Sequence, residues 1–280
     1  MVCPRKCRTY GDFCGAEINV RVAAYGLHNW EEPCISGENG SGAIFFSGCN
    51  LRCTFCQNID ISRNPKQCRE MSIFDIRNTM RELADKGAHN INLVTPTHYT
   101  PVLSTVLEDK PDIPIVWNSG GYELSTTLES LRGKVDVFLP DMKYSDSGLG
   151  QKYSGIPDYF PVAQTAIRAM YAITGDYVIE NGLLKRGVLI RHLMLPNELE
   201  NTLGVIKWVS KFKRGQVLFS LMSQYTPNGA NGIPMGQITQ AEYDTAIEYM
   251  HKCGITNGYA QELSSARQGY VPNWFLKGQL

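Results

Sequence analysis

The sequence predicts an α/β fold made of repeated strand–helix units around a mostly parallel sheet. From residue 43 onward, short apolar runs alternate with amphipathic stretches, and no linker or internal repeat divides the chain. The 280 residues, 43% of them hydrophobic, are enough for one large core. Six such units could close partly into a barrel or form an open, doubly wound sheet. In both architectures, ligands bind at the carboxyl ends of the strands.

Residues 1–42 are expected to form an N-terminal extension that precedes the strand–helix units of residues 43–280. This segment is rich in Cys, Gly and Pro and shows no sustained period, so we expect an irregular, cysteine-rich cap.

Apolar runs and helix signals place the elements in order. The predicted strands are 43–47, 91–95, 113–117, 135–139, 188–194 and 217–222. The predicted helices are 72–87, 100–110, 158–175, 198–213 and 239–253. Ser72 and Asp75 have the spacing of a capping box at the start of the first helix. The Asn181-Gly182 pair between apolar runs predicts a hairpin within residues 177–186.

Charge and cysteine content limit the class of partner. Lys and Arg total 27 and Asp and Glu also total 27, so we expect no nucleic-acid partner. No apolar run is long enough for a membrane span or a signal peptide, which favours a reducing, cytoplasmic location without a membrane partner. In that compartment, closely spaced members of the nine cysteines are better metal ligands than disulfide partners.

Cys49, Cys53 and Cys56 follow the first predicted strand with C-x3-C-x2-C spacing. Soft thiolates select zinc or iron–sulfur clusters, and a [4Fe-4S] cluster with only three cysteines keeps one iron open to an exogenous ligand. The alternatives are a zinc site completed by another cysteine, or buried free thiols.

This loop, with the aromatic Phe55 before its last cysteine, resembles the radical S-adenosylmethionine (SAM) superfamily. The Cys3-Pro4-Arg5 stretch, residues 28–33 (HNWEEP), residues 45–58 (FFSGCNLRCTFCQN) and Pro96-Thr97-His98 are more closely similar to the branch of activating-enzyme-like iron–sulfur proteins related to pyruvate formate-lyase activating enzyme. The resemblance covers essentially the whole chain. It implies a partial (β/α)6 barrel in which Cys49, Cys53 and Cys56 hold a [4Fe-4S] cluster, and SAM chelates the fourth iron.

The resemblance also implies an activity. An electron from the reduced cluster, supplied by a donor such as flavodoxin or ferredoxin, cleaves SAM to methionine and a 5′-deoxyadenosyl radical. That radical abstracts hydrogen from a protein or peptide substrate, for example a glycine in a glycyl-radical enzyme. A small metabolite is the alternative substrate. A non-catalytic zinc or electron-transfer protein is the alternative from another class.

Many relatives carry a Gly-Gly-Glu stretch after the second strand, which helps to hold the amino group of SAM, and this chain has Thr95-Pro96-Thr97-His98 there. Hydroxyl and carbonyl oxygens can accept from an ammonium group, so we expect Thr95 and Thr97 to contact SAM. His98 is expected to contact SAM or substrate, with a packing role as the alternative.

Asn118-Ser119 and Asp141-Met142-Lys143 match the Asp-Thr and Asp-Leu-Lys stretches of glycyl-radical activating enzymes, and we expect them to bind the cofactor. Those relatives can bind a monovalent cation partly through both aspartates, and Asn118 in place of the first argues against a cation here. Lys143 is expected to pair with a carboxylate of SAM or substrate, or else to neutralise Asp141.

Arg191 lies within an apolar strand, where a charge must be paired. It is expected to bind the carboxylate of SAM, with an ion pair to a residue such as Asp141 as the alternative. Gln224, after the last strand, is expected to contact adenine or substrate, with a core or rim role as the alternative.

A second group of cysteines precedes the barrel: Cys3, Cys7, Cys14 and Cys34. Four thiols could close a zinc site or ligate a second iron–sulfur cluster, and free thiols are the alternative.

Overall fold

A computed structural model describes residues 2–64, 68–227 and 232–263 of the chain. Its strands are β1 (Val20–His28), β2 (Ser41–Phe46), β3 (Arg69–Met71), β4 (Ile91–Val94), β5 (Ile115–Ser119), β6 (Val137–Pro140), β7 (Val178–Glu180), β8 (Leu183–Leu193), β9 (Leu218–Met222) and β10 (Gly258–Ala260). Its helices are α1 (Pro33–Ser36), α2 (Ile59–Arg63), α3 (Ile73–Asp85), α4 (Thr100–Val106), α5 (Ser125–Glu129), α6 (Ser147–Ser154), α7 (Tyr159–Thr174), α8 (Leu199–Val209) and α9 (Gln240–Lys252), with 3₁₀ turns η2 (Thr97–Tyr99) and η3 (Leu107–Asp109).

The strands form one sheet in the order β10–β9–β8–β6–β5–β4–β2–β1–β3, with β7 paired to β8 outside this path. All neighbours from β2 to β10 along this order are parallel, whereas β1 and β3 add an antiparallel edge. The predicted α/β class is therefore confirmed, and the sheet is a partial barrel that does not close. The six predicted strands correspond to β2, β4, β5, β6, β8 and β9.

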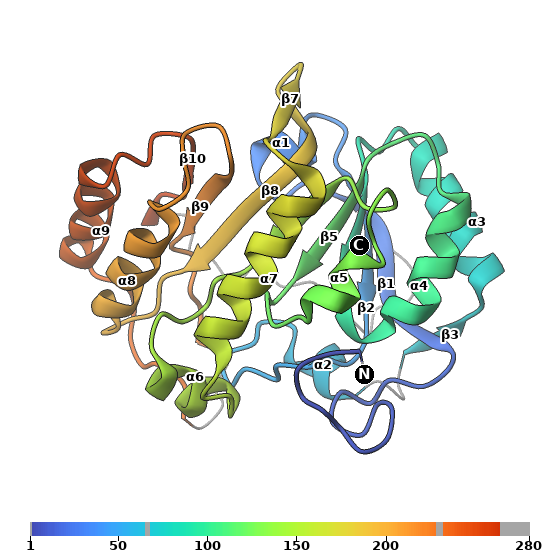
Figure 1. Cartoon of the computed structure of the whole chain (residues 1–280), viewed down its shortest axis with the longest axis horizontal. Coiled ribbons are helices and arrows are strands. Elements are labelled where there is room, and N and C mark those ends of the chain that lie inside the picture. Colours follow the sequence, from blue (N-terminus) through green and yellow to red (C-terminus); the bar gives the residue numbers. More distant parts are fainter. Residues whose placement is uncertain (1, 65–67, 228–231, 264–280) are drawn as a thin grey trace.

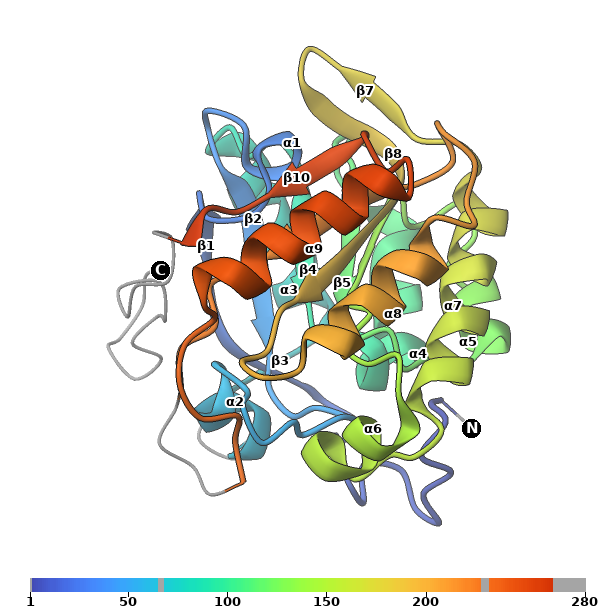
Figure 2. The ribbon, with the colours of Figure 1, turned by 90° about the vertical axis from the view of Figure 1, so that its left-hand side faces the viewer.

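The longer helices follow one another around the outer face of the curved sheet (Figures 1 and 2). None of the helices in the described part of the chain has the length and apolar content needed to cross a membrane. The predicted helices correspond to α3, α4 with η3, α7, α8 and α9.

Local signals explain where these elements begin. The capping box of α3 is present, because the Ser72 hydroxyl accepts from the Asp75 amide and the Asp75 carboxylate accepts from the Ser72 amide. Ile76, Met80 and Leu83 then fall on one buried face. The predicted hairpin is also present: Asn181 and Gly182 both have positive φ (51° and 79°), as a two-residue turn between β7 and β8 requires.

The expectation of an irregular N-terminal segment is wrong for residues 20–42. Strand β1 pairs with β2 from Val22 to His28 and with β3 from Val20 to Val22, and residues 33–36 form helix α1, so this segment contains regular structure. Its signal was weak because most of β1 is only half-buried and no clean alternation of apolar and polar residues marks it. Elements such as β3, β10, α2 and α6 are too short to show a clear period in the sequence. Residues 2–19 contain no helix or strand, as expected.

Candidate active site

A cavity of about 250 Å³ lies at the carboxyl ends of the parallel strands. The predicted site residues that line it are Cys49, Cys53, Phe55, Cys56, Thr95, Asn118, Ser119, Asp141, Lys143, Arg191 and Gln224. They come from the loops after β2, β4, β6 and β9 and from β5 and β8 themselves, as expected for a site at the carboxyl ends of such strands.

The cysteine loop has an irregular backbone that turns the sulfurs toward this cavity. Gly48 and Arg52 have positive φ (81° and 54°), and all three thiols are free. The Leu51 amide donates to the Cys49 sulfur at 3.3 Å, and the Ser154 hydroxyl donates to the Cys53 sulfur at 3.1 Å. Such donors favour the thiolate form that a metal centre needs.

Burial dominates the ionisation of these thiols. It raises the pKa of Cys56 to about 12, with the neighbouring Cys49 and Cys53 adding to the effect, and burial raises the pKa of Cys49 as well. Without a cation beside them, the thiols of Cys49 and Cys56 would stay protonated at neutral pH. Within the described ranges, no three His, Cys, Asp or Glu side chains are placed to hold one metal ion. A [4Fe-4S] cluster binds each cysteine at a separate iron, so its three sulfurs need not converge on one ion.

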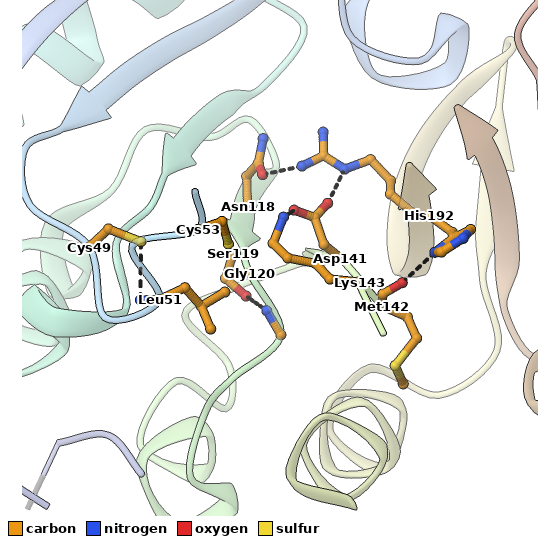
Figure 3. Close-up of polar contacts among 12 residues, drawn as sticks. Cys49, Leu51, Cys53, Asn118, Ser119, Gly120, Asp141, Met142, Lys143 and His192 are labelled. Carbon is orange, nitrogen blue, oxygen red and sulfur yellow. Dashed lines mark hydrogen bonds and ion pairs between the residues drawn. The ribbon is translucent and has the colours of Figure 1, made fainter. Parts of the chain in front are cut away.

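Arg191 is the centre of a charged network on the opposite side of the cavity. Its Nε donates to Asp141 at 3.0 Å, its Nη1 to Glu31 at 2.9 Å and its Nη2 to Asn118 at 2.6 Å. Lys143 Nζ donates to the other oxygen of Asp141 at 2.7 Å. Figure 3 shows Asn118, Asp141 and Lys143 beside the loop that carries Cys49 and Cys53. The structure thus contains the ion pairs that the sequence offered as alternatives for Arg191 and Lys143.

Asp141, Lys143 and Arg191 stay charged at neutral pH. Burial alone would raise the pKa of Asp141, but Lys143 and Arg191 lower it. Burial alone would lower the pKa of Arg191 and of Lys143, but the nearby carboxylates raise both. Inside the cavity, Asp141 thus contacts both Lys143 and Arg191, and Glu31 contacts Arg191.

Glu31 belongs to this charged network, although the sequence suggested for it only a place at a substrate entrance or at the bottom of the barrel. It lies between β1 and α1, lines the cavity, and accepts from Asn92 at 2.9 Å and Asn118 at 3.2 Å in addition to Arg191. Residues 28–33 (HNWEEP) support the family resemblance, but they do not predict a partner for Glu31. Glu31 and Arg191 are 160 positions apart, and no local pattern predicts such a pair.

The predicted contacts of His98 and Thr97 with SAM or substrate are wrong, because neither side chain lines the cavity. The His98 Nε2 lies 2.7 Å from the Ser47 carbonyl oxygen, and burial lowers the pKa of His98 to about 4, so it is a neutral packing residue. The Thr97 hydroxyl donates to Glu123 at 2.9 Å. Glu123 is buried, also accepts from Trp117 Nε1 and the Ser119 hydroxyl, and was not predicted as a site residue.

The four cysteines Cys3, Cys7, Cys14 and Cys34 do not form one site. Cys34 is buried in α1 against residues of β5, β6 and β8, at the upper end of the molecule in Figure 1. The other three lie in the N-terminal segment at the lower end, with α2 and α6 (Figures 1 and 2). The reason is β1, which runs the height of the sheet between Cys14 and Cys34.

Comparison with known proteins identifies the class that this fold and cysteine loop define. The model of the Radical SAM superfamily matches residues 43–261, and the chain belongs to that superfamily. Membership implies a [4Fe-4S] cluster and SAM as cofactors and makes the chain a radical SAM enzyme.

Among curated proteins, the chain is 32% identical over 230 residues to the uncharacterized protein MJ0674 of Methanocaldococcus jannaschii. The alignment covers 77% of this chain and 63% of that protein, so the chain spans less than two thirds of the relative's length.

Two solved structures share the fold. SuiB of Streptococcus suis, bound to the precursor peptide SuiA, aligns with a TM-score of 0.53 and 16% identity over 78% of this chain and 48% of that one. A radical SAM methyltransferase from Sphaerobacter thermophilus aligns with a TM-score of 0.53 and 14% identity over 82% and 70% of the two chains.

Proposed function

We propose that this enzyme cleaves SAM reductively at a [4Fe-4S] cluster held by Cys49, Cys53 and Cys56 and abstracts hydrogen from a protein or peptide substrate. The observation that carries the proposal is that these three thiols line the same cavity as the charged side chains of Arg191, Lys143 and Asp141. When bound, the cluster supplies one electron to SAM, whose carbon–sulfur bond breaks to give methionine and a 5′-deoxyadenosyl radical for hydrogen abstraction.

The cavity has groups suited to the polar ends of SAM. Arg191 uses three of its N–H donors on protein partners, and Lys143 uses one on Asp141, so both retain donors for the carboxylate of SAM. Thr95 lines the cavity with a left-handed backbone (φ 59°), a conformation that is costly for a β-branched residue and that turns the chain at this point. We propose that this turn binds the amino group of SAM.

Other lining residues orient the remainder of SAM and exclude water. Phe55 packs edge-on against Tyr144, Tyr153 and Tyr225, which closes the cavity beside the cysteine loop. Gln224 lines the cavity and is fixed by Gln57, whose side chain donates to its carbonyl oxygen at 3.2 Å. We propose that Gln224 contacts the adenine of SAM or the substrate. Asn118 and Ser119 would then line the cavity beside SAM.

A peptide substrate is favoured by the outer part of the cavity. Its lining extends past the apolar Phe45, Leu193 and Met222 to Trp30, which is 62% exposed, so the cavity reaches the surface there. A segment of polypeptide could enter while the rest of the partner stays outside, and a glycine in a glycyl-radical enzyme would fit without a side chain. The structurally similar SuiB binds a precursor peptide, which agrees with this proposal.

We also propose that an acidic electron carrier, such as flavodoxin or ferredoxin, docks near the cysteine loop in a reducing cytoplasm. Arg63 on α2 donates to the carbonyl oxygen of Arg52 at 3.1 Å, which places two cations at the outer side of the loop. Such charge complementarity speeds encounter with an acidic partner.

The test of the reaction is anaerobic reconstitution with iron and sulfide, followed by dithionite and SAM. We expect 5′-deoxyadenosine from the parent and from Cys253→Ala, whose thiol lies outside the cavity, and none from Cys53→Ala. A brown, reduced parent that forms no 5′-deoxyadenosine, or an active Cys53→Ala variant, would contradict the proposal.

The substrate class is tested with anaerobic cell extract separated into macromolecules and small molecules. We expect the macromolecular fraction to stimulate 5′-deoxyadenosine formation. Stimulation by the small-molecule fraction alone would favour the second candidate, a metabolite, which the modest cavity volume also permits.

A further inference from the structure

The N-terminal strap, defined as residues 2–15, lies outside the region that the superfamily model matches and packs against the cysteine loop. Arg5 is its main contact. The Arg5 Nε donates to the carbonyl oxygen of Asn50 at 2.8 Å, and its Nη2 donates to the carbonyl oxygens of Leu51 at 3.1 Å and Ser154 at 3.0 Å. One guanidinium thus holds the loop between Cys49 and Cys53 and ties it to the end of α6.

Two further contacts fix the strap itself. The Phe13 ring stacks on the Arg5 guanidinium, 3.7 Å from its central carbon to the ring centroid. Gly48, directly before Cys49, packs against the backbone of Cys14, whose carbonyl oxygen would clash with any side chain at that position. The strap therefore contacts the loop on both sides of Cys49.

The loop needs external support because it lacks helix or strand hydrogen bonds from Gly48 to Gln57. Two of its residues, Gly48 and Arg52, adopt left-handed backbone, and for arginine this conformation is costly. Groups that orient metal ligands commonly change metal affinity by 10- to 100-fold when they are removed.

We propose that Arg5 is a positioning residue for the cluster: its hydrogen bonds to residues 50 and 51 fix the loop so that Cys49 and Cys53 face the cavity. The inference rests on the proposed function, since it assumes that these cysteines hold the [4Fe-4S] cluster.

The charge of Arg5 has a separate consequence. The guanidinium bonds the carbonyl oxygens of Asn50 and Leu51, the two residues after Cys49, so its charge lies beside the cluster loop. A positive charge near an iron–sulfur cluster stabilises the reduced form, so Arg5 raises the reduction potential. A side chain that only supported the fold would leave the potential unchanged.

The test compares Arg5→Leu and Arg5→Lys with a matched control, Arg8→Leu. Arg8 lies in the same strap, is exposed, and makes no hydrogen bond or ion pair with any described residue. After anaerobic reconstitution, iron content, the rate of iron loss to a chelator and the midpoint potential are measured, with circular dichroism of the apoproteins as the check on folding.

We expect Arg5→Leu to lose iron to the chelator at least about tenfold faster than the parent and to have a more negative potential. Arg5→Lys keeps the charge without the three-bond geometry, so we expect faster iron loss with a potential near that of the parent. Arg8→Leu should match the parent in both measurements.

Equal iron loss and equal potential in the parent and Arg5→Leu would overturn the inference. So would an Arg8→Leu variant as impaired as Arg5→Leu. If Arg5→Leu fails to fold, Arg5→Lys decides: retention of iron equal to the parent would overturn the inference. A parent that binds no cluster would instead contradict the proposed function.

Discussion

At the scale of single residues, the site depends on one buried arginine. Arg191 connects three parts of the cavity by hydrogen bonds. It donates to Asn118 in β5, to Asp141 in the loop after β6 and to Glu31 in the segment before α1. Its side chain is 13% exposed, and those of Asp141 and Glu31 are 16% and 9% exposed. Charges at this depth are tolerated because each has an opposite partner, so removing one partner is costly.

Asp141→Asn tests this dependence. It leaves Arg191 and Lys143 facing each other without the carboxylate that neutralises them, and we expect the free energy of unfolding to fall by about 3 kcal/mol. Urea unfolding at pH 7 measures it. The control is Asp109→Asn, whose partner Arg81 is exposed, and which should change stability little. Equal losses in the two variants would show that the cavity network is not energetically distinct.

His98 predicts a pH dependence of stability. Its pKa in the folded protein is about 4, below the ordinary value of 6.5, because the ring is buried. Between these two pH values the unfolded chain binds a proton that the folded chain does not, so stability falls as pH falls. At pH 5 the loss from His98 amounts to about 2 kcal/mol relative to pH 7.

Urea unfolding at pH 7 and pH 5 checks this expectation in the parent and in His98→Gln. The variant should lose less stability between the two pH values than the parent does, whatever its stability at pH 7. Identical losses would mean that His98 is protonated in the folded state and does not pack as the structure shows.

At the scale of elements, short-range chemistry decides where helices and turns begin. The capping box of α3 and the Asn181-Gly182 turn depend on neighbours at most three positions apart, so the sequence contains all the information they need. By contrast, β3 and β10 are only three residues long and exist because a neighbouring strand offers an edge.

Ser72→Ala tests the cap of α3. The substitution removes the hydroxyl that accepts from the Asp75 amide, and we expect a loss of about 1 kcal/mol in unfolding free energy. Ser147→Ala is a suitable control, because Ser147 is exposed at the start of α6 and that helix is capped by Asp146 instead. A loss at Ser147 as large as that at Ser72 would contradict the assigned role of the cap.

At the scale of the whole molecule, the N-terminal segment is part of the enzyme rather than an appendage. Strand β1 covers the edge of β2, Glu31 reaches Arg191, and the strap holds the cysteine loop. A division at residue 42 separates regions that differ in composition, but the hydrogen bonds of the sheet cross it.

A chain shortened to residues 43–280 tests this integration. Its β2 edge would lose its partner strand, and the buried Arg191 would lose one carboxylate. We expect an aggregated or unfolded product by gel filtration and circular dichroism. A monomeric fragment that melts cooperatively at the temperature of the parent would show that residues 43–280 fold on their own.

The sequence by itself determined six of the parallel strands, the longer helices and the cysteine loop, because hydrophobic period, caps and ligand spacing are local properties of the chain. The tertiary structure alone decided that Glu31 and Arg191 pair, that His98 packs on Ser47 outside the cavity, that Cys34 lies apart from the other N-terminal cysteines, and that Arg5 supports the cluster loop. These contacts join residues far apart in sequence, and they depend on the order of strands in the sheet, which no local pattern encodes.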